Sequence, residues 1–144
     1  MTQVDFYILD SESDEARLRL ACKIAEKATQ LDHHVFVHST SDDEAVKLDE
    51  LLWTFSQGSF IPHRVVRAPL DAPLREPVLI GVNAPPGPGR WDVLINLGAD
   101  VPEFFSRYER VAEVVDANAV RREQSRERYR FYRDRGYKLN THQV

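Results

Sequence analysis

The sequence predicts an α/β fold in which helices flank a mostly parallel β-sheet, and three observations support this prediction. Short apolar runs alternate with amphipathic helical patterns over residues 4–53, and a helix supplies the long crossover that two parallel strands require. The length of 144 residues suits a single domain spanning residues 1–144. Hydrophobic residues make up 42% of the chain and charged residues 29%, which excludes a disordered or collagenous protein.

The first half of the chain carries the clearest signals for individual elements. Residues 4–9 are apolar, β-branched and aromatic, which predicts a buried strand. A helix is expected from about Asp14, with apolar residues at spacings of three and four: Ala21, Ile24, Ala25, Ala28 and Leu31. Residues 34–38 predict a second strand. Residues 39–42 then offer several N-cap side chains for a helix that runs to about Trp53.

The middle of the chain is less regular. The segment 57–64 is short and is interrupted by a proline, which argues against a central strand. Residues 78–80 and 92–97 predict two further strands. The segment 84–90 between them is rich in proline and glycine, so we expect a mobile connecting loop there.

The last third of the chain combines a strand with a long helix. Residues 102–110 indicate a short helix, and residues 111–115 indicate the last strand of the sheet. A long terminal helix is then expected from Asn118 to about Arg135. Gly136 should end this helix, because glycine readily adopts the left-handed conformation that follows many helix C-termini.

The sequence argues against disulfide, membrane, cofactor and metal chemistry. The only cysteine, Cys22, can form neither an internal disulfide nor a cysteine zinc site. No apolar run approaches the roughly 18 residues of a membrane span, and the N-terminus lacks a basic signal region, so a cytoplasmic location is expected. Asp10, Glu12 and Asp14 follow the first strand, where a nucleotide-binding loop would need glycines. The histidines do not cluster, so we expect no metal, no cofactor and no catalytic residues.

The charges are distributed unevenly along the chain. From Asn118 to the end, eight basic residues against three acids give +5, whereas the first 117 residues carry −9. One face of the terminal helix, an arc of about 100° around its axis, carries a basic stripe made of Arg122, Arg126, Tyr129, Arg130 and Arg133. Val120 and Phe131 lie on the opposite face and are expected to anchor the helix to the core. Arginines four residues apart repel each other with little acid to offset them, so the stripe predicts an acidic ligand more than a merely solvated face.

Two acidic ligands satisfy this pattern. Single-stranded nucleic acid could place its phosphates along the arginines and stack a base on Tyr129. A short acidic peptide ending in an apolar residue could pair its carboxylates with guanidinium groups and pack its last side chain against the tyrosine and a neighbouring valine. The charge of −9 on the rest of the chain would repel a polyanion, which favours the peptide.

Several blocks of the sequence also occur together, in one order and spacing, in a known family. They are residues 6–10 (Phe-Tyr-Ile-Leu-Asp), 48–53 (Leu-Asp-Glu-Leu-Leu-Trp), 59–63 (Ser-Phe-Ile-Pro-His), 92–97 (Asp-Val-Leu-Ile-Asn-Leu) and 126–133 (Arg-Glu-Arg-Tyr-Arg-Phe-Tyr-Arg), followed by Gly136, Leu139 and Asn140. Over nearly its whole length, the chain resembles the chi subunits of bacterial DNA polymerase III. The resemblance implies a Rossmann-like fold and a non-catalytic accessory subunit of the clamp loader. It also implies two partners: the acidic, phenylalanine-ended C-terminal tail of single-stranded DNA-binding protein, and the psi subunit.

The resemblance assigns residues to each partner by position. The tail pocket would comprise Val115, Arg122, Arg126, Tyr129 and Arg130, to which the helix-face pattern adds Arg133. The psi-facing surface would comprise Trp53, Phe60, Pro62 and His63, although Trp53 and Phe60 alone would suit a core at least as well. Nucleic acid would then be reached only indirectly. The alternative is direct binding of single-stranded nucleic acid by the basic helix, and a nucleotide-dependent enzyme is a third hypothesis.

Overall fold

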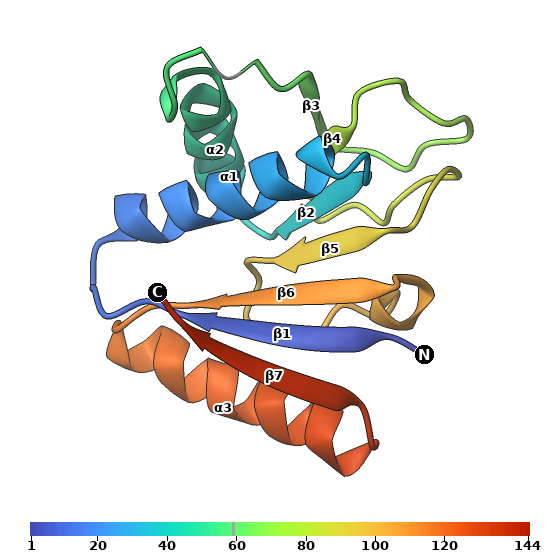
Figure 1. Ribbon diagram of the computed structural model, residues 1–144. Coiled ribbons are helices and arrows are strands. Elements are labelled where there is room, and N and C mark those ends of the chain that lie inside the picture. Colours follow the sequence, from blue (N-terminus) through green and yellow to red (C-terminus); the bar gives the residue numbers. More distant parts are fainter. Residues whose placement is uncertain (59) are drawn as a thin grey trace.

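The computed structural model describes residues 1–58 and 60–144, which contain one sheet of seven parallel strands (Figure 1). The strand order across the sheet is β3-β4-β2-β5-β6-β1-β7. The strands are β1 (Gln3–Ile8), β2 (Val35–Ser39), β3 (His63–Val66), β4 (Val78–Val82), β5 (Val93–Asn96), β6 (Arg110–Val115) and β7 (Lys138–Gln143). The helices are α1 (Asp14–Gln30), α2 (Asp42–Thr54) and α3 (Ala119–Asp134). The α/β fold and parallel sheet predicted from the sequence are confirmed.

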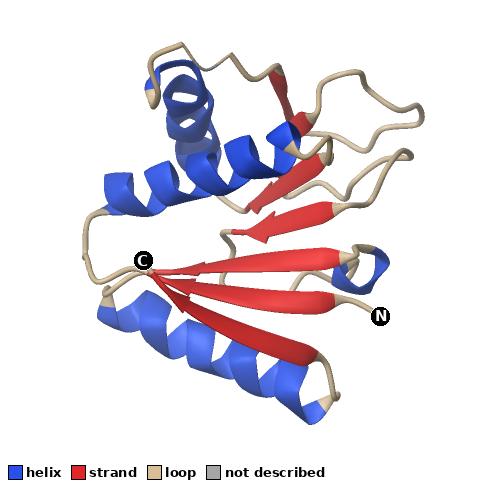
Figure 2. Ribbon diagram, in the orientation of Figure 1, coloured by secondary structure: helices blue, strands red, loops and turns tan. Residues whose placement is uncertain are grey.

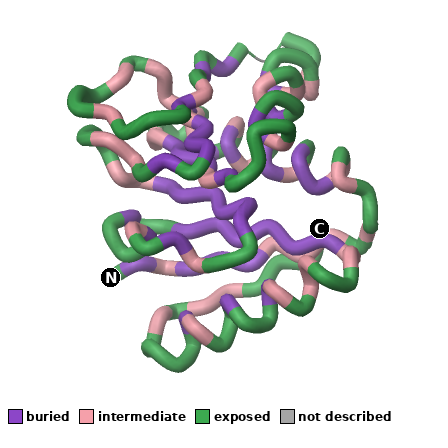
Figure 3. Tube along the Cα trace, turned by 180° about the vertical axis from the view of Figure 1, so that it is seen from behind, coloured by how far each residue is buried: buried purple, intermediate pink, exposed green. Residues whose placement is uncertain are grey.

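Helices cover both faces of the sheet and divide the core in two. Figure 2 shows α1 and α2 on one face and α3 on the other. Leu18 of α1 packs with Val37 and Ile80 in the first core, whereas Tyr132 of α3 packs with Phe6 in the second. The central strands carry much of the buried chain (Figure 3). None of the helices described combines the length and apolar character needed to span a bilayer.

Side chains cap the start of each helix. Ser13, Ser41 and Asn118 each accept a hydrogen bond from the backbone N–H three residues further on. These bonds satisfy amide groups that have no partner inside the helix. The sequence offered several candidates before α2, and the structure selects Ser41.

The end of α3 follows the predicted glycine signal. Gly136 has φ +79°, a conformation that is strained for residues with a β-carbon. The N–H of Tyr137 donates to the carbonyl of Tyr132 at 3.1 Å, and the N–H of Gly136 donates to the carbonyl of Arg133 at 3.0 Å. This pair of bonds satisfies the last carbonyls of the helix and turns the chain toward β7.

The prediction that residues 111–115 form the last strand is wrong, because β7 follows α3. Its sequence, Lys-Leu-Asn-Thr-His-Gln, lacks the apolar alternation that predicts a strand. β7 pairs with β1 at the edge of the sheet, and Asn140 and His142 contact Asp5 Oδ1 at 3.2 and 3.1 Å. Long-range pairing therefore forms this strand where local sequence does not.

The short helix expected over residues 102–110 is reduced to a single 3-10 turn, Phe105–Arg107, and Arg110 already belongs to β6. Phe105 is buried in the α3-side core, with its ring 5.3 Å from that of Tyr132. This tertiary contact holds the turn in place. The predicted helix cannot continue to Arg110, because Arg110 pairs in the sheet as the first residue of β6.

The middle of the chain agrees with its prediction in two respects. Residues 57–64 contribute no central strand, although β3 begins at His63 on the outer edge of the sheet. Ser59 lies outside the described residues. The segment 84–90 connects β4 to β5 without regular structure, as expected for its prolines and glycines.

A buried carboxylate fixes α3 on the sheet. Glu113 of β6 is fully buried and accepts hydrogen bonds from Arg128 Nε at 2.9 Å, Tyr132 Oη at 2.7 Å and Asn96 Nδ2 at 3.0 Å. Burial and the neighbouring carboxylate raise the pKa of Tyr132 above its usual range, so its hydroxyl remains a donor. The buried face of α3 is therefore the one that carries Ser125, Arg128 and Tyr132.

The predicted anchor face of α3 is wrong at Val120, which is 66% exposed. Phe131 is only partly buried, against the α3-side core. At 100° per residue, the buried face seen in the structure lies about 100° from the predicted one. The spacing of apolar residues did not predict this buried face, because one of its members, Arg128, is charged and is buried only through its pairing with Glu113.

Replacing Glu113 with alanine should lower the free energy of unfolding by about 3–5 kcal/mol, because the Arg128 guanidinium would stay buried without its carboxylate. Urea denaturation followed by circular dichroism would measure this loss. Glu123→Ala is the control and should cost less than about 1 kcal/mol, because Glu123 forms an exposed ion pair. A loss for Glu113→Ala no larger than the control's would contradict the anchoring role.

Candidate binding cleft beside α3

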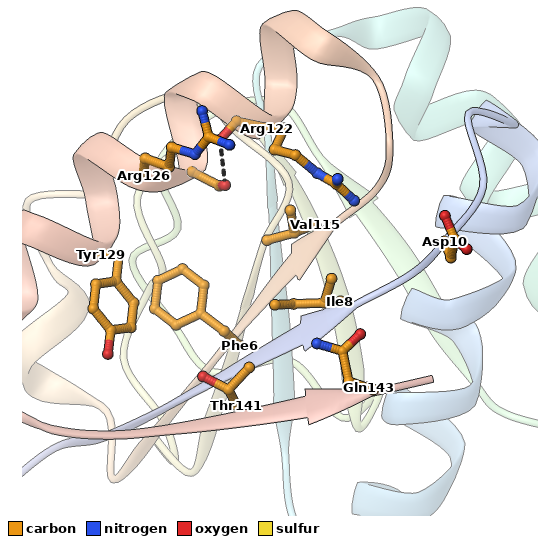
Figure 4. Close-up of a pocket in the computed structure, with 10 residues that line it drawn as sticks. Phe6, Ile8, Asp10, Val115, Arg122, Arg126, Tyr129, Thr141 and Gln143 are labelled. Carbon is orange, nitrogen blue, oxygen red and sulfur yellow. Dashed lines mark hydrogen bonds between the residues drawn. The ribbon is translucent and has the colours of Figure 1, made fainter.

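A cleft of about 510 Å³ opens between α3 and strands β1 and β7 (Figure 4). It lies on the α3 face of the sheet, over the C-terminal halves of both strands. Its lining residues are Phe6, Ile8, Asp10, Val115, Arg122, Ser125, Arg126, Tyr129, Thr141 and Gln143. We call this hollow the α3 cleft.

The floor of the α3 cleft is largely apolar. Strand alternation places Phe6 and Ile8 of β1 on the same face, and Val115 is the partner of Ile8 in the β1–β6 register. On the other side of β1, Thr141 and Gln143 are the register partners of Phe6 and Ile8. The floor can therefore receive an apolar or aromatic group, with polar side chains at its β7 border.

Tyr129 stands at one end of the α3 cleft (Figure 4). Its ring meets that of Phe6 edge-on, with 5.3 Å between the centroids. Tyr129 is nevertheless 38% exposed, so part of it is free to contact a ligand. Arg126 and Arg122 follow along the helix toward the opposite end, which Asp10 borders.

Across residues 1–58 and 60–144, neither of the two cleft arginines is paired with a buried acid. Within the part of the chain that the structure describes, Arg122 has no carboxylate within 4 Å. Arg126 Nη1 lies 3.0 Å from Glu123 Oε2, but both side chains are largely exposed. Such a pair contributes little to stability, so Arg126 can exchange this acid for one on a ligand.

Two other arginines of α3 hold the fold together. Arg121 makes three hydrogen bonds to the buried carboxylate of Asp116: Nε donates to both oxygens at 3.0 and 3.2 Å, and Nη2 donates to Oδ2 at 2.5 Å. These bonds raise the pKa of Arg121. Arg128 pairs with Glu113 and also donates to the carbonyl of Ala99 at 2.9 Å. Neither arginine is available to a ligand.

The remaining stripe residues, Arg130 and Arg133, do not line the α3 cleft. Arg130 pairs with Glu127, one turn away, and Arg133 pairs with the adjacent Asp134. The sequence argument of uncompensated repulsion along the stripe is therefore wrong, because acids of the same helix offset these charges. The case for an acidic ligand depends instead on the geometry of the cleft.

Four of the residues expected in the tail pocket come together in the cleft: Val115, Arg122, Arg126 and Tyr129. Sequence reasoning missed the residues contributed by β1 and β7. Alternation along β1 would have placed Phe6 on the α3 face once the side of α3 was known. No sequence signal could have found the β7 residues, because β7 itself was not predicted.

A second group of aromatic residues lies at the end of α2. The Trp53 ring is 5.4 Å from that of Phe60, and Pro62 next to them is exposed. Trp53 is 49% exposed and Phe60 is 72% exposed, so the alternative that both are core residues is wrong. Exposed aromatic residues in contact with each other are typical of protein interaction surfaces. We call this group the Trp53 surface.

His63 is the buried member of this region and packs against the ring of Trp53. Its side chain is fully buried, and its ring lies 4.5 Å from that of Trp53. Its Nδ1 lies 2.7 Å from the carbonyl oxygen of Ile61, and its Nε2 lies 3.0 Å from Asp49 Oδ1. These contacts fix the orientation of the imidazole under the indole.

Other chemically capable side chains do not assemble into a site. Burial raises the pKa of the Cys22 thiol to about 12, so it is protonated and unreactive near neutral pH. Burial lowers the pKa of His38, which favours its neutral form. Among the residues described, no three His, Cys, Asp or Glu side chains converge as metal ligands would.

Comparison with known proteins identifies the family. Residues 1–140 match the family described as DNA polymerase III chi subunit, HolC. The DNA polymerase III subunit chi of Pseudomonas aeruginosa is 40% identical over 144 residues, which cover 100% of this chain and 98% of the relative. This chain belongs to the DNA polymerase III chi subunit family.

Two further relatives extend this assignment. The DNA polymerase III subunit chi of Escherichia coli K12 is 30% identical over 146 aligned positions, covering 98% of this chain and 97% of the relative. The protein of the same name from Haemophilus influenzae is 28% identical over 139 positions, covering 96% and 95%. The resemblance to chi subunits predicted from the sequence is confirmed. The match includes all of α3 and the Trp53 surface.

Two neighbouring arginines of this chi-family chain should respond differently to removal. Arg121→Ala should lower the free energy of unfolding by about 3 kcal/mol, because it strands the buried carboxylate of Asp116. Arg122→Ala should change it by less than about 0.5 kcal/mol, because Arg122 has no such partner. Thermal and urea denaturation of both variants measure the contrast. Equal losses would show that the structural and free arginines have been misassigned.

Proposed function

We propose that this chain is a non-catalytic accessory subunit of the DNA polymerase III clamp loader that binds two protein partners. The acidic C-terminal tail of single-stranded DNA-binding protein enters the α3 cleft, and a psi subunit docks on the Trp53 surface. The observation that carries the first assignment is an apolar floor bordered by one free and one exchangeable arginine. The proposal agrees with membership of the chi family.

The chemistry of a phenylalanine-ended acidic tail matches the α3 cleft part by part. The terminal ring packs on Phe6 and Val115 beside Tyr129, where burial of an aromatic side chain contributes about 1.5–3 kcal/mol. Its terminal carboxylate pairs with Arg122, and the preceding acids pair with Arg126. Further acids run along α3, where Arg130 and Arg133 can exchange their partners on the same helix for those of the tail.

The positions of the two surfaces suit a linking role. The Trp53 surface borders β3 through His63, and the α3 cleft borders β7, so they lie at opposite edges of the sheet. Seven strands spaced by about 4.8 Å put roughly 29 Å between these edges. Two partners can therefore bind at once without competing for space. Single-stranded DNA is reached only through the tail-bearing partner.

Replacing Arg126 with alanine should weaken binding of a synthetic tail peptide by about 1–3 kcal/mol, through loss of a charge-assisted contact. Isothermal titration calorimetry measures the change. Arg19→Ala is a matched control, because Arg19 also forms an exposed ion pair on a helix, but on α1, away from the cleft. Added salt should weaken the wild-type affinity, and deletion of the terminal phenylalanine should reduce it at least tenfold.

Two results would contradict the tail assignment. One is an unchanged affinity for Arg126→Ala; the other is tight binding of a single-stranded oligonucleotide by the chain alone. Anisotropy titration with a labelled oligonucleotide provides the second measurement and would favour direct nucleic-acid binding.

Replacing Trp53 with alanine should abolish co-purification with a psi subunit while tail-peptide affinity stays within twofold of wild type. The half-exposed indole contributes to contact more than to the core, so the variant should fold. Val46→Ala, which also truncates an exposed apolar residue of α2, should leave co-purification intact. Unchanged psi binding by Trp53→Ala would show that the psi subunit binds another part of the chain.

A further inference from the structure

A second large hollow lies on the opposite face of the sheet from the α3 cleft. We call it the α1 groove: a space of about 540 Å³ between α1 and strands β5, β6 and β1. Its apolar lining comprises Tyr7, Leu20, Ile24, Ala28, Val93 and Ala112. Tyr7 alternates with Phe6 and Ile8 along β1, which places the two hollows on different faces of the same strand.

The α1 groove occupies a position on the sheet that has no helix of its own. Figures 1 and 2 show α1 and α2 over the β3 to β6 part of this face, and within the described residues no helix covers β1 and β7 there. In layered α/β folds, helices packed side by side normally cover the apolar face of the sheet. The polar residues toward β7 are already satisfied, because Asn140 and His142 contact Asp5. Beside α1, the apolar side chains of Tyr7, Leu20 and Ile24 therefore stay partly exposed, above the buried Val93 and Ala112.

The borders of the α1 groove carry positive charge. Lys23 and Lys27 lie one turn apart on α1, and neither has a carboxylate within 4 Å among residues 1–58 and 60–144. Across the groove, Arg110 Nε is 3.7 Å from Asp5 Oδ2, and that buried oxygen has no hydrogen-bond partner in the described structure. The arginine is thus held loosely.

The acids near the α1 groove offset this charge only in part. Asp92 pairs with Arg90 at 2.9 Å and accepts a hydrogen bond from the His34 N–H at 2.8 Å, so its charge is already matched. Glu109 is the other acidic side chain of the lining, and Asp5 lies against Arg110, so the positive charge that has no acidic partner within 4 Å in the described structure is that of Lys23 and Lys27. These cations belong to the part of the chain that carries −9 overall, so a local positive border stands out against an acidic body.

An exposed apolar side chain extends the groove at the end of α1. Leu31, which follows the helix, is 62% exposed and lines the hollow. A closed site for a small metabolite would bury such a residue, whereas a protein partner would cover it on binding.

We propose that the α1 groove is a docking site for one amphipathic helix of a partner protein, with apolar residues on one face and acids along its borders. The helix lies beside α1 over β6 and β1, in the uncovered helix position. Its apolar face packs on the partly exposed side chains of Tyr7, Leu20 and Ile24. Its carboxylates pair with Lys23, Lys27 and Arg110. This interaction is independent of the tail and psi assignments, because it uses a different face from the α3 cleft and none of the Trp53 surface residues.

The test uses a synthetic peptide about 18 residues long, since shorter helices are marginal in water. It carries leucines on one helical face, glutamates on both borders and alanines elsewhere. Titrated into the isotope-labelled full chain, it should move the amide NMR signals of Tyr7, Ile24 and Ala112 in a saturable manner. The double variant Lys23→Glu/Lys27→Glu should weaken this binding at least tenfold.

Matched controls separate the α1 groove from the α3 cleft. Lys47→Glu, a charge reversal on the neighbouring α2, and Arg126→Ala, in the α3 cleft, should each leave the peptide affinity within twofold. Lys23→Glu/Lys27→Glu should retain its circular dichroism spectrum and its affinity for the acidic tail peptide. A peptide with lysines in place of the glutamates should not bind.

Four outcomes would overturn the proposal: no saturable shifts, shifts confined to the α3 cleft, equal binding of the lysine peptide, or insensitivity to charge reversal. A parallel titration with decanoate tests whether the groove instead binds small amphipathic anions. Saturable shifts at the same amides with higher affinity for decanoate than for the peptide would assign the groove to small amphipathic anions instead of a helix.

Discussion

The buried carboxylate of Glu113 sets the orientation of α3 and, with it, the geometry of the α3 cleft. A carboxylate in the core is stable only if its oxygens are bonded, and here Arg128, Tyr132 and Asn96 supply the donors. Arg128 and Tyr132 both belong to α3, so satisfying Glu113 fixes the rotation of the helix about its axis. That rotation turns Arg122, with Arg126 and Tyr129, toward the α3 cleft.

The arginines of α3 have different roles although the sequence makes them look alike. Arg121 and Arg128 pair with buried carboxylates, where removal of either partner would strand a charge. Arg126 shares its charge with an acid in solvent, and such a bond is easily exchanged. A count of basic residues therefore overstates the charge that a ligand would meet. The available charge is that of Arg122 together with the exchangeable Arg126, Arg130 and Arg133.

The architecture also explains where partner surfaces can form on a parallel sheet. Central strands are covered on both faces, whereas the two edges keep polar strands and exposed side chains. The α3 cleft uses the β7 edge, and the Trp53 surface lies beside the β3 edge. The α1 groove shares the β1 region with the α3 cleft but faces the other way. One rigid sheet can thus separate several contacts in space.

The α/β class, the positions of the three long helices, the Gly136 stop and the resemblance to chi subunits could all be predicted from the sequence, because they follow from local patterns and from the order of sequence blocks along the chain. The sequence also placed Arg122, Arg126 and Tyr129 on one side of a helix, since helical periodicity is a local property. That β7 is a strand could not be predicted, because its pairing partner lies 135 positions away in sequence and becomes visible only in the folded chain. Only the structure turned Val120 outward and Arg128 inward, because a buried ion pair outweighs apolar spacing and cannot be seen until both partners are brought together.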